Sequence, residues 1–139
     1  MPELRPLFHL LWEDVAIDQD KFVAKCDEKK YASLEELDML HLVTIRNDGK
    51  LAGLYLVFLT PNGHYDGQGT MAFTDIYYLL PEFRKGNIGM KLFAYAEQTW
   101  RNRGVVKAYT SHKIHRDRSL MMKELGWTAS DTVYSKVLA

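Results

Sequence analysis

The sequence predicts an α/β (α+β) protein with a central, mixed, twisted β-sheet flanked by helices on both faces. Its second half alternates strand-like and helix-like segments, which favours strands joined by helical crossovers. An apolar run ending at Leu80 stops at Pro81 and is followed by an Arg/Lys/Gly loop and a helical pattern. A strand, a turn and a helix in that order place a loop at the sheet edge where α/β proteins bind ligands.

Two helices are predicted before the first strand. Apolar residues at helical spacing indicate a helix over 7–26, with a break near Asp18–Asp20. Ser33 followed by Glu36 is typical of a capping box, so a short second helix is expected to begin at Ser33.

A β-hairpin follows, with strands over 42–46 and 51–59 around the turn at 47–50. Another strand is expected over 71–80. The second half then predicts a helix from the loop to about Arg103, a strand over 105–111, a helix over 117–125 and a last strand over 133–138. The element order is therefore ααβββαβαβ.

Composition favours a single folded domain over residues 1–139. The chain is 47% hydrophobic and 26% charged, which is ordinary for a globular protein. Lys+Arg and Asp+Glu are both 18, and this zero net charge argues against a general nucleic-acid partner. Cys26 is the only cysteine, and no apolar run reaches a membrane-spanning length or resembles a signal peptide. A cytoplasmic protein with no membrane partner is expected.

The loop between Leu80 and the next helix is a predicted anion site, because helix N-termini offer free N–H groups and positive dipole ends. Two nucleotide motifs do not fit it. The Gly-Lys-Ser/Thr of a P-loop is absent, and Gly86 and Gly89 do not supply the spacing of a dinucleotide fingerprint.

The loop does resemble a third phosphate site. Arg84 to Gly89, reached through Leu79-Leu80-Pro81, is similar to the Arg/Gln-x-x-Gly-x-Gly/Ala pyrophosphate loop of the GNAT N-acetyltransferase family. The helix closing on Gly126-Trp127 and the terminal segment Thr132 to Leu138 also resemble that family's last elements. The resemblance is strong over the second half of the chain and weak over the first.

That resemblance implies acetyl-CoA as acyl donor. Its pyrophosphate would lie on the loop, and its pantetheine arm would pair with backbone groups of Leu79 and Leu80, as an added strand does. The implied cofactor-binding residues of the loop are Arg84, Lys85, Gly86, Asn87, Ile88 and Gly89. His115 falls where many members carry an asparagine that contacts the cofactor.

Two residues depart from the family pattern. Asn87 occupies the place of the first motif glycine, and asparagine is the non-glycine residue most tolerant of left-handed backbone. Met122 falls where many members carry the tyrosine that protonates the departing thiolate, and methionine cannot do this.

Three residues are candidates for proton transfer. Asp75 lies near the middle of the strand ending at Leu80, and strand alternation would place it on the same face as Tyr77 and Leu79. His112 ends the next strand, and histidine is a side-chain type suited to proton transfer. Tyr134, on the expected last strand, is an alternative acid. His112 and His115 lack a third ligand, so no metal site is predicted.

The sequence therefore predicts an acyl-CoA-dependent N-acyltransferase that moves acetyl to an amine by direct attack in a ternary complex. The acceptor would be a small molecule, a peptide or a protein. One alternative is a GNAT-fold module that binds CoA or a protein with little or no transfer. Another is a toxin-like enzyme acting on aminoacyl-tRNA, which the zero net charge disfavours. The resemblance is also compatible with a homodimer.

Overall fold

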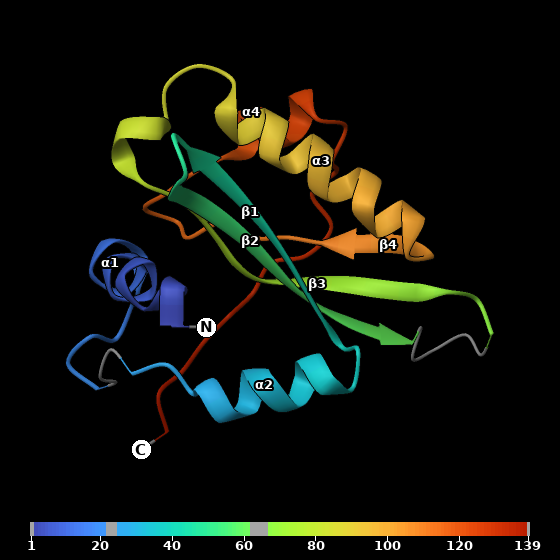
Figure 1. The fold of residues 1–139 in the computed structure, drawn as a ribbon, viewed down its shortest axis with the longest axis horizontal. Coiled ribbons are helices and arrows are strands. Elements are labelled where there is room, and N and C mark those ends of the chain that lie inside the picture. Colours follow the sequence, from blue (N-terminus) through green and yellow to red (C-terminus); the bar gives the residue numbers. More distant parts are fainter. Residues whose placement is uncertain (1, 22–24, 62–66, 139) are drawn as a thin grey trace.

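The computed structural model describes residues 2–21, 25–61 and 67–138. Within these ranges, four strands form one sheet in the order β1-β2-β3-β4. Helices α3 and α4 lie on one side of the sheet, and α1 and α2 lie on the other (Figure 1). The predicted mixed sheet with helices on both faces is confirmed.

The first three strands are antiparallel, and β4 pairs in parallel with β3. The turn between β1 and β2 has left-handed backbone at Asp48 and Gly49, with φ of 50° and 77°. This is the hairpin geometry that asparagine, aspartate and glycine favour. The strands span β1 Leu40–Asn47, β2 Lys50–Pro61, β3 Thr70–Leu79 and β4 Val105–Tyr109.

The helices differ from the prediction mainly in the first half. They are the short 3-10 turn η1 Pro2–Leu4, α1 Arg5–Val15, α2 Glu28–Glu36, the 3-10 turn η2 Pro81–Phe83, α3 Ile88–Asn102 and α4 Ser119–Glu124. In the second half, α3 and α4 match the predicted helices to within a few residues.

Helix α1 is shorter than the predicted helix over 7–26, so that extent is wrong. The backbone becomes extended at Ala16, directly after Val15. The side-chain amide of Gln19 donates to the carbonyls of Trp12 and Ala16, at 3.0 Å and 3.1 Å. Carbonyls at a helix end need such donors, and here a local side chain supplies them. Residues 22–24 of the predicted helix lie outside the described residues.

The capping box at Ser33 is also wrong. Helix α2 begins at Glu28, because the Asp27 side chain accepts a hydrogen bond from the Lys30 N–H at 3.1 Å. Ser33 lies inside the helix, and its hydroxyl donates to the Lys29 carbonyl at 3.0 Å. Serine and aspartate both favour N-caps, and the turn that the earlier start adds contains Tyr31, which packs in a buried cluster with β2 and β3.

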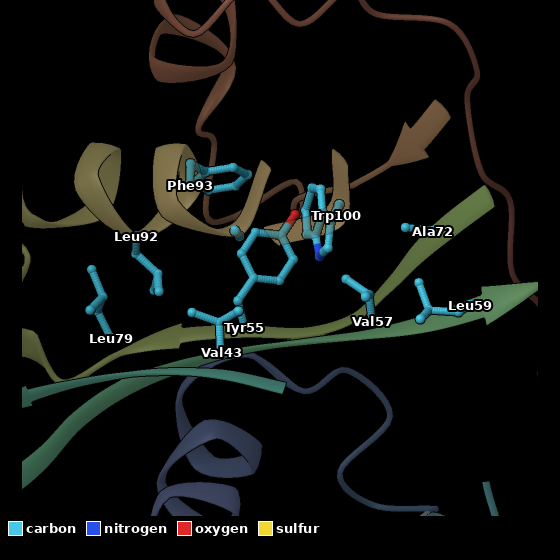
Figure 2. Packing of buried hydrophobic residues seen from close by; sticks show 10 residues of the cluster. Val43, Tyr55, Val57, Leu59, Ala72, Leu79, Leu92, Phe93 and Trp100 are labelled. Atoms are coloured by element: carbon cyan, nitrogen blue, oxygen red, sulfur yellow. The ribbon is translucent and has the colours of Figure 1, made fainter. Parts of the chain in front are cut away.

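The main core lies between α3 and the sheet (Figure 2). Phe93 and Trp100 of α3 meet Tyr55 of β2 edge-to-face, at ring distances of 4.9 Å and 5.1 Å. All three side chains are buried. Aromatic burial of this kind fixes α3, and therefore the loop before it, against the sheet.

The predicted last strand over 133–138 does not form. The segment after Trp127 has no helix or strand, and Figure 1 shows it crossing from the α3 side of the sheet toward the α1 and α2 side. Val133, Tyr134 and Leu138 are 81%, 88% and 88% exposed. Alternating apolar residues predict strand geometry, but only a neighbouring strand edge can satisfy that geometry with hydrogen bonds.

We expect Phe93→Ala to lower the free energy of unfolding by about 3–5 kcal/mol, because it removes a fully buried ring from the α3–sheet core. Tyr95→Ala on the same helix is the matched control. Its ring is 64% exposed, so a change within about 0.5 kcal/mol is expected. Urea titration followed by circular dichroism measures both, and equal losses would contradict this description of the core.

Candidate active site

The sheet divides between β3 and β4. The two strands pair only where Thr70–Phe73 faces Val105–Tyr109, and β3 then continues alone to Leu79. We call the region between residues 74–79 and 110–118 the β3–β4 split. Among the described residues, backbone groups of β3 that face this region have no strand partner there. They offer a ligand the same pairing that an added strand would use.

A β-bulge lies at the start of this unpaired stretch. Leu56 pairs with Ile76 and Val57 pairs with Thr74, so Asp75 is the extra residue of β3. Bulges redirect side chains and occur often beside active sites. The expectation that Asp75 shares a face with Tyr77 and Leu79 is wrong, because the extra residue breaks the alternation.

Asp75 instead meets α2 on the opposite side of the sheet. Its Oδ2 accepts a hydrogen bond from the Tyr31 hydroxyl at 2.5 Å. Tyr31 is buried, whereas Asp75 remains exposed. Burial, together with the bond to the carboxylate, raises the pKa of Tyr31 above its ordinary value. Tyr31 is therefore a neutral donor throughout the physiological pH range, and it orients one carboxylate oxygen while the other stays accessible.

The loop before α3 leaves the helix N-terminus open. The first helical hydrogen bond runs from the Lys91 N–H to the Asn87 carbonyl at 2.9 Å, so the N–H groups of Ile88, Gly89 and Met90 lack helical acceptors. The Asn87 side chain does not cap them. Three outward N–H groups and the helix dipole make a suitable phosphate site.

The left-handed residue of this loop is Gly86, with φ of 76°, whereas Asn87 has φ of −109°. The substitution of asparagine for the first motif glycine therefore needs no left-handed backbone at position 87. Gly89 is required for a different reason: a Cβ there would lie 2.8 Å from the Tyr77 hydroxyl. Its absence lets the first turn of α3 approach β3 closely.

Arg84, the expected cation of the loop, is held by the protein itself. Its Nε donates to the Leu79 carbonyl at 2.9 Å, and its Nη2 lies 2.5 Å from Asp14 Oδ2. Its guanidinium also lies over the Tyr78 ring. Asp14, at the end of α1, contacts Arg116 as well. One carboxylate thus fastens both loops that border the β3–β4 split, and the charge of Arg84 is already compensated.

The backbone groups of Leu80 are engaged too. Its N–H donates to the Ala52 carbonyl at 2.9 Å, and its carbonyl accepts from the Phe83 N–H at 2.9 Å. Leu80 therefore has no free donor for a pantetheine arm, in contrast to the sequence-based expectation. The Leu79 carbonyl already accepts from Arg84. The backbone available to a ligand lies further back along β3.

A second arginine lies inside the split. The Arg118 guanidinium is 4.4 Å from the centre of the Tyr77 ring, and its Nη2 donates to the Ser111 carbonyl at 2.8 Å. Burial lowers the pKa of Arg118 below its ordinary value and raises that of Tyr77 to about 12. Nearby, the buried Thr110 hydroxyl has no hydrogen-bond partner among the described residues.

The structure does not assemble the three proton-transfer candidates. His112 lies in the loop after β4, 3.5 Å from Asp117, and no hydrogen bond or ion pair joins it to Asp75. Tyr134 is 88% exposed on the terminal segment, so the expected strand position that suggested it is absent. His115 is exposed in the loop before α4. Of the three candidates, Asp75 is the one that a buried side chain, Tyr31, holds by a hydrogen bond.

Across the described ranges, no group of three potential metal ligands is found, and no helix is long and apolar enough to cross a membrane.

Comparison with known proteins decides the family. A family profile described as the acetyltransferase (GNAT) family matches residues 4–127. The chain belongs to the GNAT acetyltransferase family. GNAT proteins in general use acetyl-CoA and an acceptor substrate, and the open α3 N-terminus and the β3–β4 split fit such a donor. A search of curated proteins found no match.

Solved structures share the fold at low identity. A transcriptional regulator from Bacillus halodurans C-125 is 18% identical with a TM-score of 0.78, over 99% of this chain and 94% of that one. Glucosamine-6-phosphate N-acetyltransferase from Arabidopsis thaliana is 13% identical with a TM-score of 0.72, over 97% and 90%. An aminoglycoside acetyltransferase from an uncultured soil sample, in complex with sisomicin, is 15% identical with a TM-score of 0.75, over 99% and 86%.

Two residues of this GNAT site escaped the sequence analysis. Asp14 is one of many acidic residues on an amphipathic helix, and nothing local indicates that it contacts positions 84 and 116. Tyr31 has no motif around it, and only the bulge at Asp75 brings the two together. Both contacts join distant segments, so a pattern within one segment could not have revealed them.

We expect Asp14→Ala to lower the free energy of unfolding by about 1–3 kcal/mol, because it leaves Arg84 and Arg116 without their shared, partly buried carboxylate. Glu13→Ala is the control on the same turn of α1. Its pair with His9 is exposed, so the cost should stay within about 0.5 kcal/mol. Thermal and urea unfolding measure the difference, and a silent Asp14 variant would contradict the fastening role.

Proposed function

We propose that this GNAT protein is an N-acetyltransferase that moves acetyl from acetyl-CoA to an amine by direct attack in a ternary complex. The observation that carries the proposal is the β3–β4 split, with its unpaired β3 backbone, next to the uncapped N-terminus of α3. The former suits the pantetheine arm, and the latter suits the pyrophosphate. The bound donor supplies an activated thioester carbonyl.

Asp75 is the proposed proton acceptor. The acceptor amine must be neutral to attack, and a carboxylate, directly or through a water molecule, can take its proton. The nitrogen lone pair forms the new C–N bond, and collapse of the tetrahedral intermediate breaks the C–S bond. The Tyr31 hydroxyl holds one oxygen of Asp75, which leaves the exposed oxygen for the amine. Unpaired β3 N–H groups are suitable donors to the developing oxyanion.

The departing sulfur has no tyrosine acid at position 122. Met122 packs against the core next to α3, and Tyr134 is exposed outside the sheet. A thiol titrates near pH 8.5, so CoA can leave as a thiolate and take its proton from water. No cysteine is needed as a covalent carrier, because the amine attacks the thioester directly.

The acceptor is proposed to be an amine because related folds carry out that chemistry. The Arabidopsis neighbour is named as an acetyltransferase of glucosamine 6-phosphate, and the soil enzyme is named for aminoglycosides. At this identity they support the fold alone. An amino sugar, an aminoglycoside, a peptide and a protein amine are therefore equal starting points for an acceptor screen.

A second candidate is a CoA-binding or protein-interaction module with little transfer. Met122 favours it, because it removes the acid on which the leaving group relies in many relatives. The transferase and the CoA-binding module both require donor binding and differ in turnover, whereas a protein-interaction module requires neither.

We expect acetyl-CoA to bind and to raise Tm, and an amine acceptor to release free CoA thiol. Isothermal titration calorimetry measures the first, and a thiol-reactive dye measures the second across amino sugars, aminoglycosides and peptides. Binding without thiol release in every acceptor class would favour the module. No binding, beside a GNAT control that binds, would exclude the transferase and the CoA-binding module, and would leave the protein-interaction module.

We expect Asp75→Asn to lower kcat/KM by about 10²–10⁴, because the amide cannot accept a proton. Tyr31→Phe should lower kcat/KM less, since the carboxylate remains. Glu35→Gln, an exposed change on α2, is the control and should leave kcat/KM unchanged. If His112→Ala lowers kcat/KM to this extent while Asp75→Asn does not, His112 is the base and the Asp75 assignment fails.

A further inference from the structure

Arg118 differs from every other arginine of the chain. The sequence contains seven arginines, all of them described. Six lie within 4.0 Å of a carboxylate, whereas Arg118 has no carboxylate that close among the residues that the structure describes. The paired residues are Arg5, Arg46, Arg84, Arg101, Arg103 and Arg116. Arg118 is also the arginine whose pKa burial lowers. A charge withdrawn from water without a counter-ion is costly, which makes it a strong attractor for an anion.

The position of Arg118 identifies the place where that anion would lie. Its guanidinium packs on the face of Tyr77, 4.4 Å from the ring centre. The hydroxyl at the far end of this ring lies 2.8 Å from the position that a Cβ of Gly89 would take. Arg118 is therefore one aromatic ring away from the first turn of α3, where the free N–H groups are.

Arg84 and Arg118 thus have opposite electrostatic situations. Arg84 belongs to the loop motif, but Asp14 already compensates its charge, and its Nε is bonded to the Leu79 carbonyl. Arg118 belongs to no motif, and among the described residues it donates a hydrogen bond to the neutral Ser111 carbonyl. Of these two arginines, Arg118 is therefore the one whose charge is available to a ligand in the split.

We propose that Arg118 binds the pyrophosphate of acyl-CoA across the β3–β4 split, while Arg84 shapes the loop that supplies the N–H groups. This inference rests on the proposed function, since it assumes that acyl-CoA is the ligand. A guanidinium presents several donors in one plane and suits phosphate oxygens. Packing on Tyr77 limits the orientations of that plane before the ligand arrives.

The test compares CoA binding to the wild type with binding to Arg118→Met and Arg118→Lys, by isothermal titration calorimetry. Methionine retains apolar bulk against Tyr77 and removes the charge. We expect Kd for CoA to rise at least about 10-fold in the Met variant and less in the Lys variant. Arg101→Met is the control, because Arg101 is exposed on α3, and its Kd should stay within about 2-fold.

Comparing CoA with dephospho-CoA and acetyl-CoA identifies the group of the ligand that Arg118 contacts. Dephospho-CoA lacks the 3′-phosphate, and acetyl-CoA has no free thiol. We expect the Met variant to lose the same factor for CoA, dephospho-CoA and acetyl-CoA. A loss confined to CoA and acetyl-CoA would place Arg118 on the 3′-phosphate, and a loss confined to the free thiols would place it on the sulfur. Either result overturns the pyrophosphate assignment.

Thermal unfolding separates binding from folding. A purely structural Arg118 predicts a lower Tm for the free Met variant and an unchanged shift on adding CoA. We expect the reverse: little loss of Tm without ligand and a smaller shift with CoA. If the Met variant does not fold, the Lys variant decides, and wild-type affinity there for all three ligands overturns the proposal.

The failure of this inference is distinct from that of the proposed function. A wild-type protein that binds no acyl-CoA contradicts the function itself. A wild type that binds, beside a folded Arg118→Met variant with equal affinity, contradicts only the role of Arg118.

Discussion

The site depends on β3 extending beyond its parallel partner. Four residues of β3 pair with β4, and the strand then continues along the edge of the split with the bulge at Asp75. If β4 were longer, its hydrogen bonds would occupy the backbone groups that we assign to the donor. If the bulge were absent, Asp75 would lie on the α3 face, away from Tyr31. The short length of β4 therefore determines the proposed donor site, and the extra residue of β3 determines the position of the proposed base.

The two faces of the sheet suit different substrates. The α3 face contains the phosphate loop, Gly89 and Arg118, which suit an anionic donor. The α1 and α2 face contains the Tyr31–Asp75 pair, which suits an amine. Donor and acceptor would thus approach the sheet from opposite sides and meet through the split, as direct transfer requires.

The sequence predicted the parts of the fold that depend on local chemistry. The hairpin turn, the strand before Pro81, the loop and the helix from Ile88 all follow from residues close together in the chain, and all are confirmed. Ser33 and Asp27 show the limit, because both residue types are good caps and the structure uses Asp27. The terminal segment shows another limit, since its alternation is strand-like but no neighbouring edge receives it.

The features of the candidate site that depend on nearby residues were likewise predictable from the sequence, and those that depend on distant contacts were not. The loop was recognisable from Arg84 to Gly89, but the side-chain partners that decide what each cation does come from α1 and from the loop before α4. The position of Asp75 in its strand suggested a role in proton transfer. The face of the sheet on which Asp75 lies depends on a bulge that no local sequence pattern predicts. Contacts between distant segments are the information that a single sequence lacks.

The double contact of Asp14 has a thermodynamic consequence. One carboxylate at the end of α1 joins the loop before α3 to the loop before α4. An acceptor that displaces the end of α1 would loosen both loops and so weaken the hold on the donor. Linkage requires the reverse effect to be equal in size: a bound donor that tightens these loops would make α1 harder to displace and would weaken acceptor binding by the same factor. In this protein the mutual weakening of donor and acceptor binding would then be an equilibrium property of one aspartate.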